Sequence, residues 1–351
     1  MRIEEIQVPD YEKVVHAVDP TVGLNAFIGV HNTKLGPALG GMRMWPYESE
    51  KEALTDVLRL SRGMSYKSAV ARTGLGGGKS VIIGDPKKVK SPQLLQAMGR
   101  FIDTLGGTYI TAEDVNIGVA DLKEVKKTTK YVTGLPREEG SSGNPSPFTA
   151  RGVYLGIQTC LDEVFGSKDV KGRHVAIQGT GSVARSVIAF LMEGGATVTI
   201  CDIDEERVKT VQATHPGVKT VAPDSIYDVA CDVFSPHALG AILNDRTIPR
   251  LKCRIVAGAA NNQLAEPRHA DVLRAKGILY APDYVINAGG IINVSCELQP
   301  GGYNETLALA KIQNIGDALR DVFRASKERG ISTGDAADIV AQRIIAEGKK
   351  S

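Results

Sequence analysis

The sequence lacks any long apolar run. Hydrophobic residues make up 42% of the 351 residues, yet no stretch approaches the roughly 20 consecutive apolar residues that a membrane-spanning helix needs. The N-terminal segment, MRIEEIQVPD, is acidic and has no apolar core of the kind found in a secretory signal peptide. We therefore expect no membrane partner, and we predict a cytoplasmic location.

The sequence also lacks an excess of charge of one sign. It has 42 Lys and Arg residues against 40 Asp and Glu residues, a formal net charge of +2, and no segment dominated by Lys and Arg. Proteins that bind nucleic acids usually carry a clustered basic surface that contacts the phosphates. The balanced charge therefore predicts no nucleic-acid partner.

Cysteine is scarce. The count is odd, no pair has the CxxC spacing, and several of the five lie in apolar, strand-like runs: Cys160, Cys201, Cys231, Cys253 and Cys296. This pattern favours free, buried thiols in a reducing compartment over disulfides. We predict free thiols and no bound metal.

Residues 134–147, GLPREEGSSGNPSP, differ in composition from the rest of the chain. They are dense in Gly, Ser and Pro and have no hydrophobic periodicity, as in a linker or a functional loop. After this linker, helical stretches alternate with short apolar strands at residues 174–178, 197–201, 231–234 and 253–257. This alternation predicts a parallel sheet with helices on both faces.

Strands and helices also alternate before the linker. Ser49 and Glu52 form a capping box that predicts the start of a helix, and we expect this helix to stop near Gly63. Further strands are predicted at residues 80–83 and 109–112, and further helices from Ser91 to Gly106-Gly107 and at residues 305–326 and 334–347. The chain is therefore predicted to be an α/β protein of two domains.

A glycine-rich turn follows the strand at residues 174–178. It has the G-x-G-x-x-A form, and a helix and a second strand follow it. Gly179 permits the tight turn, and Gly181 lets the backbone approach a pyrophosphate at the helix N-terminus. Asp202 ends the second strand, where an acid receives ribose hydroxyls and would repel a 2′-phosphate. This order predicts an NAD site, which includes Thr180, Ser182 and Val183, rather than a merely tight loop.

Three charged residues before the linker lie at predicted ends of helices or strands: Lys67, Lys79 and Asp114. Two lysines close together in a cleft repel each other, so the pKa of at least one falls, and a neutral amine can act as a base. The three glycines before Lys79 would let a ligand approach the backbone. The alternative is that each lysine is a solvated surface residue.

A phosphate-binding P-loop is disfavoured at GLGGGKS. The first glycine of that motif would fall at Thr73, and Lys79 is predicted to open a strand rather than a helix. The glycine run therefore does not predict hydrolysis of a nucleoside triphosphate.

Taken together, these motifs resemble the glutamate/leucine/phenylalanine/valine dehydrogenase superfamily, and most closely its leucine dehydrogenase branch. The matching stretches run in family order from about residue 36 to 294, and they include GPALGGMRMWPYESEKEAL, RLSRGMSYK, GLGGGKSVIIGDP, YITAEDVN, GSSGNPSPFTARGVY, IQGTGSVA, SPHALGAILND, VAGAANNQL and ILYAPDYVINAGGIINV. The resemblance implies an N-terminal α/β domain for substrate binding and oligomerisation at residues 1–135. It also implies a doubly wound, Rossmann-type NAD-binding domain at residues 136–328, and a helical segment at residues 329–351 that packs back on the first domain.

The resemblance implies roles for individual residues of the first domain. Lys67 would bind the substrate carboxylate, and Gly40 would line the substrate site. Lys79 would activate water as a lysine of low pKa, and Asp114 would shuttle protons to and from the amino group.

Substrate choice is expected to depend on the apolar lining of the pocket, which the resemblance assigns to Leu39, Met64, Ala112, Ile291 and Val294. None of these residues would pair with the side-chain carboxylate of glutamate, whose unpaired burial is costly. We therefore predict oxidation of a branched-chain L-amino acid, such as leucine, to its 2-oxo acid, ammonia and NADH. The same reaction on phenylalanine or tryptophan, and a catalytically silent NAD-binding sensor, stay open as alternatives.

The resemblance implies two further contacts with the cofactor, from Thr149 near the nicotinamide carboxamide and from Asn261 on the ribose side. It also implies a homo-oligomer, namely an octamer, with a dimer as the alternative. Several residues depart from the family pattern, among them Met42, Ser182 and His237. We interpret His237 as a loop residue at the cofactor edge rather than a catalytic histidine.

Overall fold

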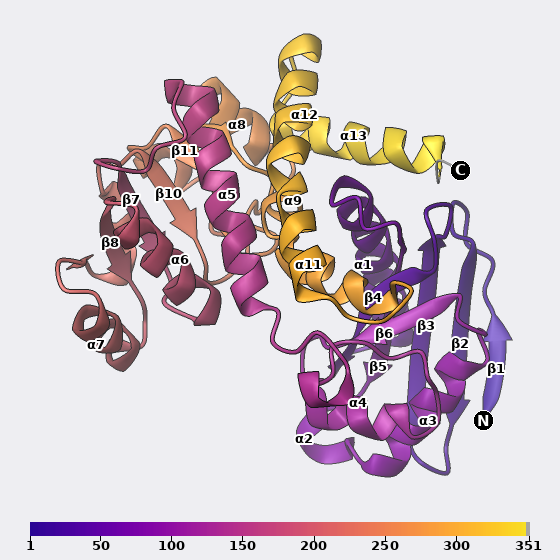
Figure 1. Cartoon of the computed structure of the whole chain (residues 1–351). Helices are drawn as coiled ribbons and strands as arrows, with labels where there is room; N and C mark the ends of the chain where they lie inside the picture. Colours follow the sequence, from indigo (N-terminus) through magenta and orange to yellow (C-terminus); the bar gives the residue numbers. More distant parts are fainter. Residues whose placement is uncertain (349–351) are drawn as a thin grey trace. The chain divides into compact units, whose positions relative to one another are not determined.

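The computed structural model describes residues 1–348, which form two compact units (Figure 1). The first unit contains Met1–Asn144, Val294–Glu305 and residues 341–348, and the second contains Pro145–Asn293 and Thr306–Val340. Each unit therefore contains separate segments of the chain. The sequence-based division at residues 135 and 328 expected only residues 329–351 to return to the first domain. Each unit is built on its own six-stranded sheet.

The sheet of the first unit is mixed and has the order β1-β2-β3-β5-β4-β6. Its strands are β1 (Arg2–Glu5), β2 (Lys13–Asp19), β3 (Leu24–Asn32), β4 (Ala38–Trp45), β5 (Gly76–Ile83) and β6 (Tyr109–Ala112). The pairs from β1 to β5 are antiparallel, whereas β4 runs parallel to both β5 and β6. The strand predicted at residues 109–112 is confirmed.

Helix α1 (Glu50–Val70) covers one face of this sheet. Its predicted start is confirmed, because the Ser49 hydroxyl accepts a hydrogen bond from the Glu52 backbone N–H at 3.2 Å. The predicted end near Gly63 is wrong. Gly63 lies on the exposed side of the helix, so it removes no packing contact, and buried residues such as Ala69 continue the contact with the sheet.

The two faces of the sheet have separate cores. Phe27 and Val81 pack with the buried side of α1, whereas the neighbouring Ile28 and Ile82 pack with residues from the opposite layer. This layer contains α2 (Pro86–Val89), α3 (Pro92–Asp103) and α4 (Val119–Lys126). Successive side chains of a strand point to opposite faces, which explains why neighbouring residues enter different cores.

The sheet of the second unit is entirely parallel and has the order β12-β11-β10-β7-β8-β9. Its strands are β7 (His174–Gln178), β8 (Thr197–Cys201), β9 (Lys219–Thr220), β10 (Val233–Pro236), β11 (Ile255–Val256) and β12 (Leu279–Tyr280). The strand order reverses between β7 and β10, which makes this a doubly wound sheet with a switch point at those two carboxyl ends. The predicted two-domain α/β fold is thus confirmed.

The helices of this part of the chain lie before, between and after these strands in the sequence (Figure 1). They are α5 (Ser146–Phe165), α6 (Ser182–Glu193), α7 (Glu205–Thr214), α8 (His269–Ala275), α9 (Asp283–Ile286), α10 (Gly289–Ser295), α11 (Glu305–Ile312), α12 (Asn314–Arg329) and α13 (Thr333–Glu347). Among the described residues, we find no helix that combines the length and the apolar character of a membrane span. All five cysteines are free, as predicted, and Cys231 alone among them is not fully buried.

The linker is partly anchored within the first unit. The Glu297 carboxylate accepts hydrogen bonds from the backbone N–H groups of Gly134 and Ser142, at 3.1 and 3.0 Å, and from the Ser141 hydroxyl. Both serines are buried. Although its composition is that of a flexible segment, this part of the linker therefore has a fixed conformation.

Candidate active site

Lys79 lies on β5, inside the sheet of the first unit. It pairs with Gly29 on β3, and its side chain lies on the face covered by α1, as does that of Val81 two residues further on. The residue is 5% exposed. The expectation that Lys79 opens the strand is wrong, because β5 begins at Gly76 and the glycine run belongs to it.

Lys79 and Asp114 form a close ion pair. Asp114 follows the end of β6, and its Oδ2 lies 2.8 Å from the Lys79 Nζ. Burial lowers the pKa of Lys79, although the neighbouring carboxylate opposes that change. Burial alone would raise the pKa of Asp114, but Lys79 and Arg43 hold it below its usual value. The site thus combines an amine that loses its proton more easily than an ordinary lysine with a carboxylate that can carry protons.

Arg43 is a member of this cluster that the sequence analysis missed. It lies on β4, and its Nε donates a hydrogen bond to Asp114 Oδ2 at 2.9 Å. Its Nη1 donates to Asp56 Oδ2 on α1 at 3.0 Å. A signal was present in the sequence, because Arg43 is the single charged residue of the otherwise mostly buried strand ALGGMRMW.

The glycine run before Lys79 serves packing. A Cβ at Gly77 would lie 1.9 Å from the Ser65 backbone nitrogen on α1, and one at Gly76 would lie 2.0 Å from the Asn32 carbonyl oxygen. These glycines therefore let α1 and the neighbouring β3 approach β5. The interpretation that they make room for a ligand is not needed to explain them.

The other predicted residues of the first unit lie on the elements that surround Lys79. Lys67 is half-buried in the last turn of α1, and Leu39 is buried on β4 beside Gly77. A Cβ at Gly40 would lie 3.4 Å from Met64 Cγ, so the structure brings these two residues together.

Ala112 and Val294 complete the predicted lining within the first unit. Ala112 is the half-exposed last residue of β6, where it pairs with Gly41, and Val294 is half-buried on α10. Asp114 follows Ala112 by two positions, so the end of β6 carries both a predicted lining residue and a charged one.

The glycine turn of the second unit follows β7 at the switch point of the sheet. Gly179 has a φ of +93°, a conformation that residues with a Cβ rarely adopt. Gly181 precedes α6, and Ser182 and Val183 form the first residues of that helix. Nothing lies within 4 Å of a Cβ built at Gly181, so no packing inside the unit requires a glycine there. Open space at a helix N-terminus suits the pyrophosphate of a dinucleotide.

Asp202 holds the glycine turn in shape. Its Oδ2 accepts hydrogen bonds from the Thr180 backbone N–H at 2.6 Å and from the Thr180 hydroxyl at 2.8 Å, and its Oδ1 accepts from the Asp204 N–H at 3.0 Å. Burial would raise the pKa of Asp202, but these hydrogen bonds lower it. The carboxylate is therefore ionised and fixed. Because Oδ2 accepts two hydrogen bonds and Oδ1 only one, Oδ1 keeps an acceptor site for a further donor.

Three further predicted residues lie in the second unit. Thr149 is in the first turn of α5, where its hydroxyl donates to the Pro145 carbonyl at 3.1 Å. The same hydroxyl lies 2.9 Å from a Cβ built at Gly290, which places Thr149 against α10, the helix that also carries the buried Ile291. Asn261 follows β11 in an exposed loop, and its Oδ1 accepts a hydrogen bond from Asn287 at 2.7 Å.

Comparison with known proteins identifies the family. The model described as Glu/Leu/Phe/Val dehydrogenase, dimerisation domain, matches residues 12–131. The model described as Glutamate/Leucine/Phenylalanine/Valine dehydrogenase matches residues 140–351. The chain belongs to the glutamate/leucine/phenylalanine/valine dehydrogenase family. The resemblance predicted from the sequence is confirmed, and with it the assignment as an amino-acid dehydrogenase.

This dehydrogenase has similar relatives with different substrates in their names. It is 52% identical to the leucine dehydrogenase of Geobacillus stearothermophilus over 97% of the chain and 92% of that protein. It is 46% identical to the phenylalanine dehydrogenase of Caldalkalibacillus thermarum over 96% of the chain and 92% of that protein. Its fold matches the L-tryptophan dehydrogenase of Nostoc punctiforme with a TM-score of 0.88 and 43% identity over 96% of each chain.

His237 is a neutral side chain at the edge of the glycine turn of this dehydrogenase. Its Nε2 donates to the Ser235 hydroxyl at 2.9 Å, because that hydroxyl itself donates to the Ala257 carbonyl at 2.6 Å. Burial lowers the pKa of His237 to about 3. Its backbone N–H donates to the Gln178 carbonyl at 2.7 Å, immediately before Gly179. His237 is therefore a loop residue beside the glycine turn, and its place at the cofactor edge stays a prediction.

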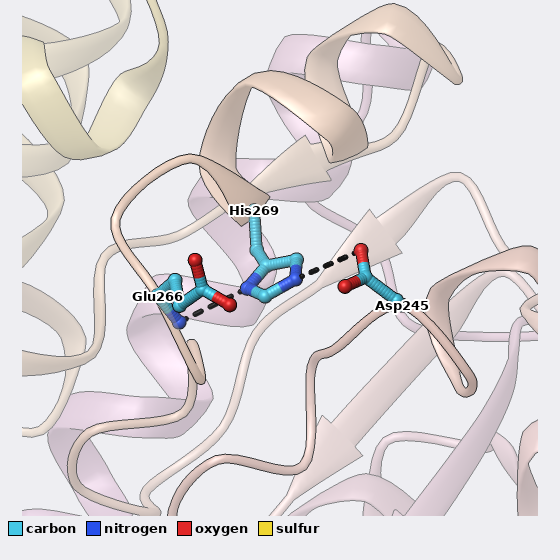
Figure 2. A group of neighbouring side chains, drawn as sticks. All are labelled: Asp245, Glu266 and His269. Atoms are coloured by element: carbon cyan, nitrogen blue, oxygen red, sulfur yellow. Dashed lines mark hydrogen bonds and ion pairs between the residues drawn. The ribbon is translucent and has the colours of Figure 1, made fainter.

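One cluster in this dehydrogenase has the residue types of a metal site. The side chains of Asp245, Glu266 and His269 point toward one another (Figure 2). However, His269 accepts from the Glu266 N–H through Nδ1 at 3.0 Å and contacts Asp245 through Nε2 at 3.2 Å. Arg268 pairs with both carboxylates, at 2.6 and 3.0 Å. Because protein groups already use these ligand atoms, we interpret the cluster as a structural network.

Proposed function

We propose that this dehydrogenase catalyses the reversible, NAD-dependent oxidative deamination of a branched-chain L-amino acid, such as leucine, to its 2-oxo acid and ammonia. The main observation in support is the buried Lys79 amine, which lies 2.8 Å from the Asp114 carboxylate. Deamination after a redox step requires a base that activates water and a group that moves protons at nitrogen, and this pair has both chemistries.

NAD is the cofactor, and when bound it accepts the hydride from the substrate Cα. The glycine turn fits such a group, because Gly181 offers open space beside the N-terminus of α6. We propose that residues Gly179, Thr180, Gly181, Ser182 and Val183 hold the pyrophosphate. Asp202 would accept the ribose hydroxyls, with Thr149 near the carboxamide and Asn261 on the ribose side.

Lys79 and Asp114 would act on the oxidised substrate. Neutral Lys79 takes a proton from the water that adds to the imine carbon, and Asp114 moves protons to and from the departing nitrogen. Asp114 Oδ2 is already bonded to Lys79 and Arg43, whereas no described residue donates to Oδ1 at hydrogen-bond distance. We therefore propose Oδ1 as the oxygen that meets the substrate amine.

Lys67 would bind the substrate carboxylate, and Gly40 would leave room for it. The preference for a branched aliphatic side chain would come from Leu39, Met64, Ala112, Ile291 and Val294. None of these residues carries a charge, which disfavours an acidic side chain. Phenylalanine or tryptophan is the second candidate substrate, because the chain is 46% identical to a phenylalanine dehydrogenase and 43% identical to an L-tryptophan dehydrogenase.

The test is a panel of leucine, valine, phenylalanine, tryptophan and glutamate with NAD and with NADP, followed by NADH absorbance at alkaline pH. We expect the highest kcat/KM for leucine with NAD. Lys79→Ala should lose about 10²- to 10⁴-fold in kcat and keep NADH binding, whereas the exposed Lys87→Ala should behave as the parent enzyme. Full activity of Lys79→Ala would refute the mechanism, and a higher kcat/KM for phenylalanine would refute the substrate assignment.

We further propose a homo-oligomer in the cytoplasm. The family model that covers residues 12–131 is described as a dimerisation domain, which supports association through the first unit. An octamer is the state implied by the resemblance, with a dimer as the alternative. Size-exclusion chromatography with light scattering measures the mass and decides between the two.

A further inference from the structure

One oxygen of Asp114 is shared by two cations. Its Oδ2 lies 2.8 Å from Lys79 Nζ and accepts the Arg43 Nε hydrogen bond at 2.9 Å. Arg43 is itself divided, because its Nη1 donates to Asp56 Oδ2 at 3.0 Å. The four side chains therefore form a chain of alternating charge, from Lys79 through Asp114 and Arg43 to Asp56.

Further hydrogen bonds hold Asp56, at the end of this series of charged side chains, in place. The Tyr47 hydroxyl donates to Asp56 Oδ2 at 2.7 Å, and Arg59 donates to Asp56 Oδ1 at 2.8 Å. Burial would raise the pKa of Asp56, but these partners lower it. Burial likewise opposes the charge on Arg43, whose pKa is nevertheless raised by Asp114 and Asp56. Both members of the Arg43–Asp56 pair are thus permanently charged in the working pH range of an enzyme.

We propose that Arg43, held in place by Asp56, is a positioning residue that divides the Asp114 carboxylate between two cations and so keeps Lys79 ready to release its proton. The inference rests on the proposed function, in which neutral Lys79 is the base. Without Arg43, Asp114 would pair with Lys79 alone and stabilise the ammonium form. Arg43 would also orient Asp114 so that Oδ1 stays available.

The signs of the two charges give opposite effects on Lys79. The positive charge of Arg43 repels a proton on Lys79 and lowers its pKa, in addition to the larger effect of burial. The negative charge of Asp56 attracts that proton and raises the pKa of Lys79. Removal of Arg43 should therefore make Lys79 harder to deprotonate, and removal of Asp56 should make it easier.

Other titratable groups on the elements around β5 do not reverse these signs. The buried or half-buried ones are His31 on β3, Tyr66 and Lys67 on α1 and Tyr109 on β6. Burial raises the pKa of Tyr109 and lowers that of His31, so both are uncharged from neutral to alkaline pH. Tyr66 and Lys67 are the same in each variant below, so they cancel in the comparison.

The outer side of the Arg43–Asp56 pair borders an open cavity. This cavity has a volume of about 620 Å³, and Tyr47, Arg59 and Val115 line it together with the pair. Lys79, in contrast, is buried. A small cation in solution can therefore reach the position of a missing guanidinium, which makes chemical rescue a direct test.

The first experiment measures kcat for leucine oxidation against pH in the full-length enzyme. We expect the acid limb of Arg43→Gln to move toward alkaline pH by about one unit. Asp56→Asn removes the negative charge but keeps an oxygen that can accept the Arg43 hydrogen bond, so its acid limb should move toward acid pH. Arg43→Lys keeps the charge and should shift the limb less than Arg43→Gln. Arg100→Gln is the matched control, since Arg100 is exposed on α3, in the opposite layer, and should leave the limb unchanged.

The second experiment adds guanidinium chloride at low millimolar concentration to Arg43→Ala, with sodium chloride at equal ionic strength as the control. Guanidinium should return the acid limb toward that of the parent enzyme. A structural defect would lower kcat in Arg43→Gln and Asp56→Asn without moving their acid limbs in opposite directions. Shifts of the same sign in Arg43→Gln and Asp56→Asn, or no shift in either, would overturn the inference.

Two measures keep the test decisive. If Arg43→Gln does not fold, as judged by thermal unfolding, the acid shift of Asp56→Asn decides alone. If the parent enzyme oxidises no amino acid, the proposed function fails, and the inference is then tested by competitive acetylation of Lys79 at different pH values, read by mass spectrometry. Slower labelling in the Arg43 variant at a given pH supports the inference, and unchanged labelling refutes it.

Discussion

Gly181 and Gly179 should respond in opposite ways to the same substitution. Gly181 has φ −67° and ψ −176°, which any residue adopts, and nothing lies within 4 Å of its added Cβ. Alanine at such a position usually stabilises a fold by about 0.4 to 1 kcal/mol, because the unfolded chain loses freedom. Gly179 has φ +93°, and its added Cβ would meet Ala238 Cβ at 3.0 Å. Alanine there should cost about 1 to 3 kcal/mol.

The same open space makes Gly181→Ala a test of the cofactor site. A methyl group placed where the pyrophosphate approaches the backbone should weaken NADH binding at least about tenfold, a loss of roughly 1.4 kcal/mol. Thermal unfolding without cofactor and NADH titration by fluorescence measure the two effects separately. We expect Gly181→Ala to keep or raise its melting temperature while it loses affinity. Parent-like NADH affinity in Gly181→Ala would refute the placement of the pyrophosphate.

Two further predictions concern packing and pH. Gly77→Ala should destabilise the first unit by about 3 kcal/mol, because the new Cβ would lie 1.9 Å from the Ser65 nitrogen. Gly63→Ala has open space around its Cβ and should stabilise the unit by up to about 1 kcal/mol. Equal melting temperatures of the two variants would contradict both predictions. The lowered pKa of Asp202 stabilises the fold above the ordinary carboxyl pKa of about 4, and this contribution is lost as pH falls through the lower folded value. Asp202→Asn should therefore reduce the free energy of unfolding at pH about 7 and differ less from the parent enzyme at pH about 3. Urea titrations at the two pH values would measure this free energy. An equal loss at both pH values would contradict the prediction.

The second unit could be predicted well because its signals are local. The strands at residues 174–178 and 197–201 have the predicted bounds, and the turn between β7 and α6 is where its glycines indicate. Buried parallel strands are continuous apolar runs between turn residues, so a single segment is enough to recognise each one.

The first unit was harder to predict because tertiary packing decides its elements. Strands β1, β2 and β4 were not predicted, since glycines and polar residues interrupt their apolar pattern, as in ALGGMRMW. The end of α1 was placed at Gly63, although the buried side of the helix continues to Val70. The glycine run was interpreted as room for a ligand, and the atoms that need this room belong to α1 and β3.

The residues of the candidate active site also differ in how far they can be predicted from the sequence. Lys79 and Asp114 could be selected as candidates from residue type and position, and the family resemblance implied their roles. Their contact at 2.8 Å supports that proposal. Arg43 could not be selected in this way, because its role depends on two partners that are 13 and 71 residues away in the sequence. A single charged residue in a buried strand is a signal that can be searched for in other sequences of this kind.

The anchored linker has a practical consequence. By composition, the segment GSSGNPSP is where one would cut the chain with a protease, insert a tag or open a circular permutant. The Glu297 carboxylate makes this a poor choice, because cleavage near Ser141 and Ser142 first requires the loss of several hydrogen bonds to a single side chain. Engineering of this enzyme should instead begin at exposed turns that no such side chain holds, for example at Gly217, which has nothing within 4 Å of its added Cβ.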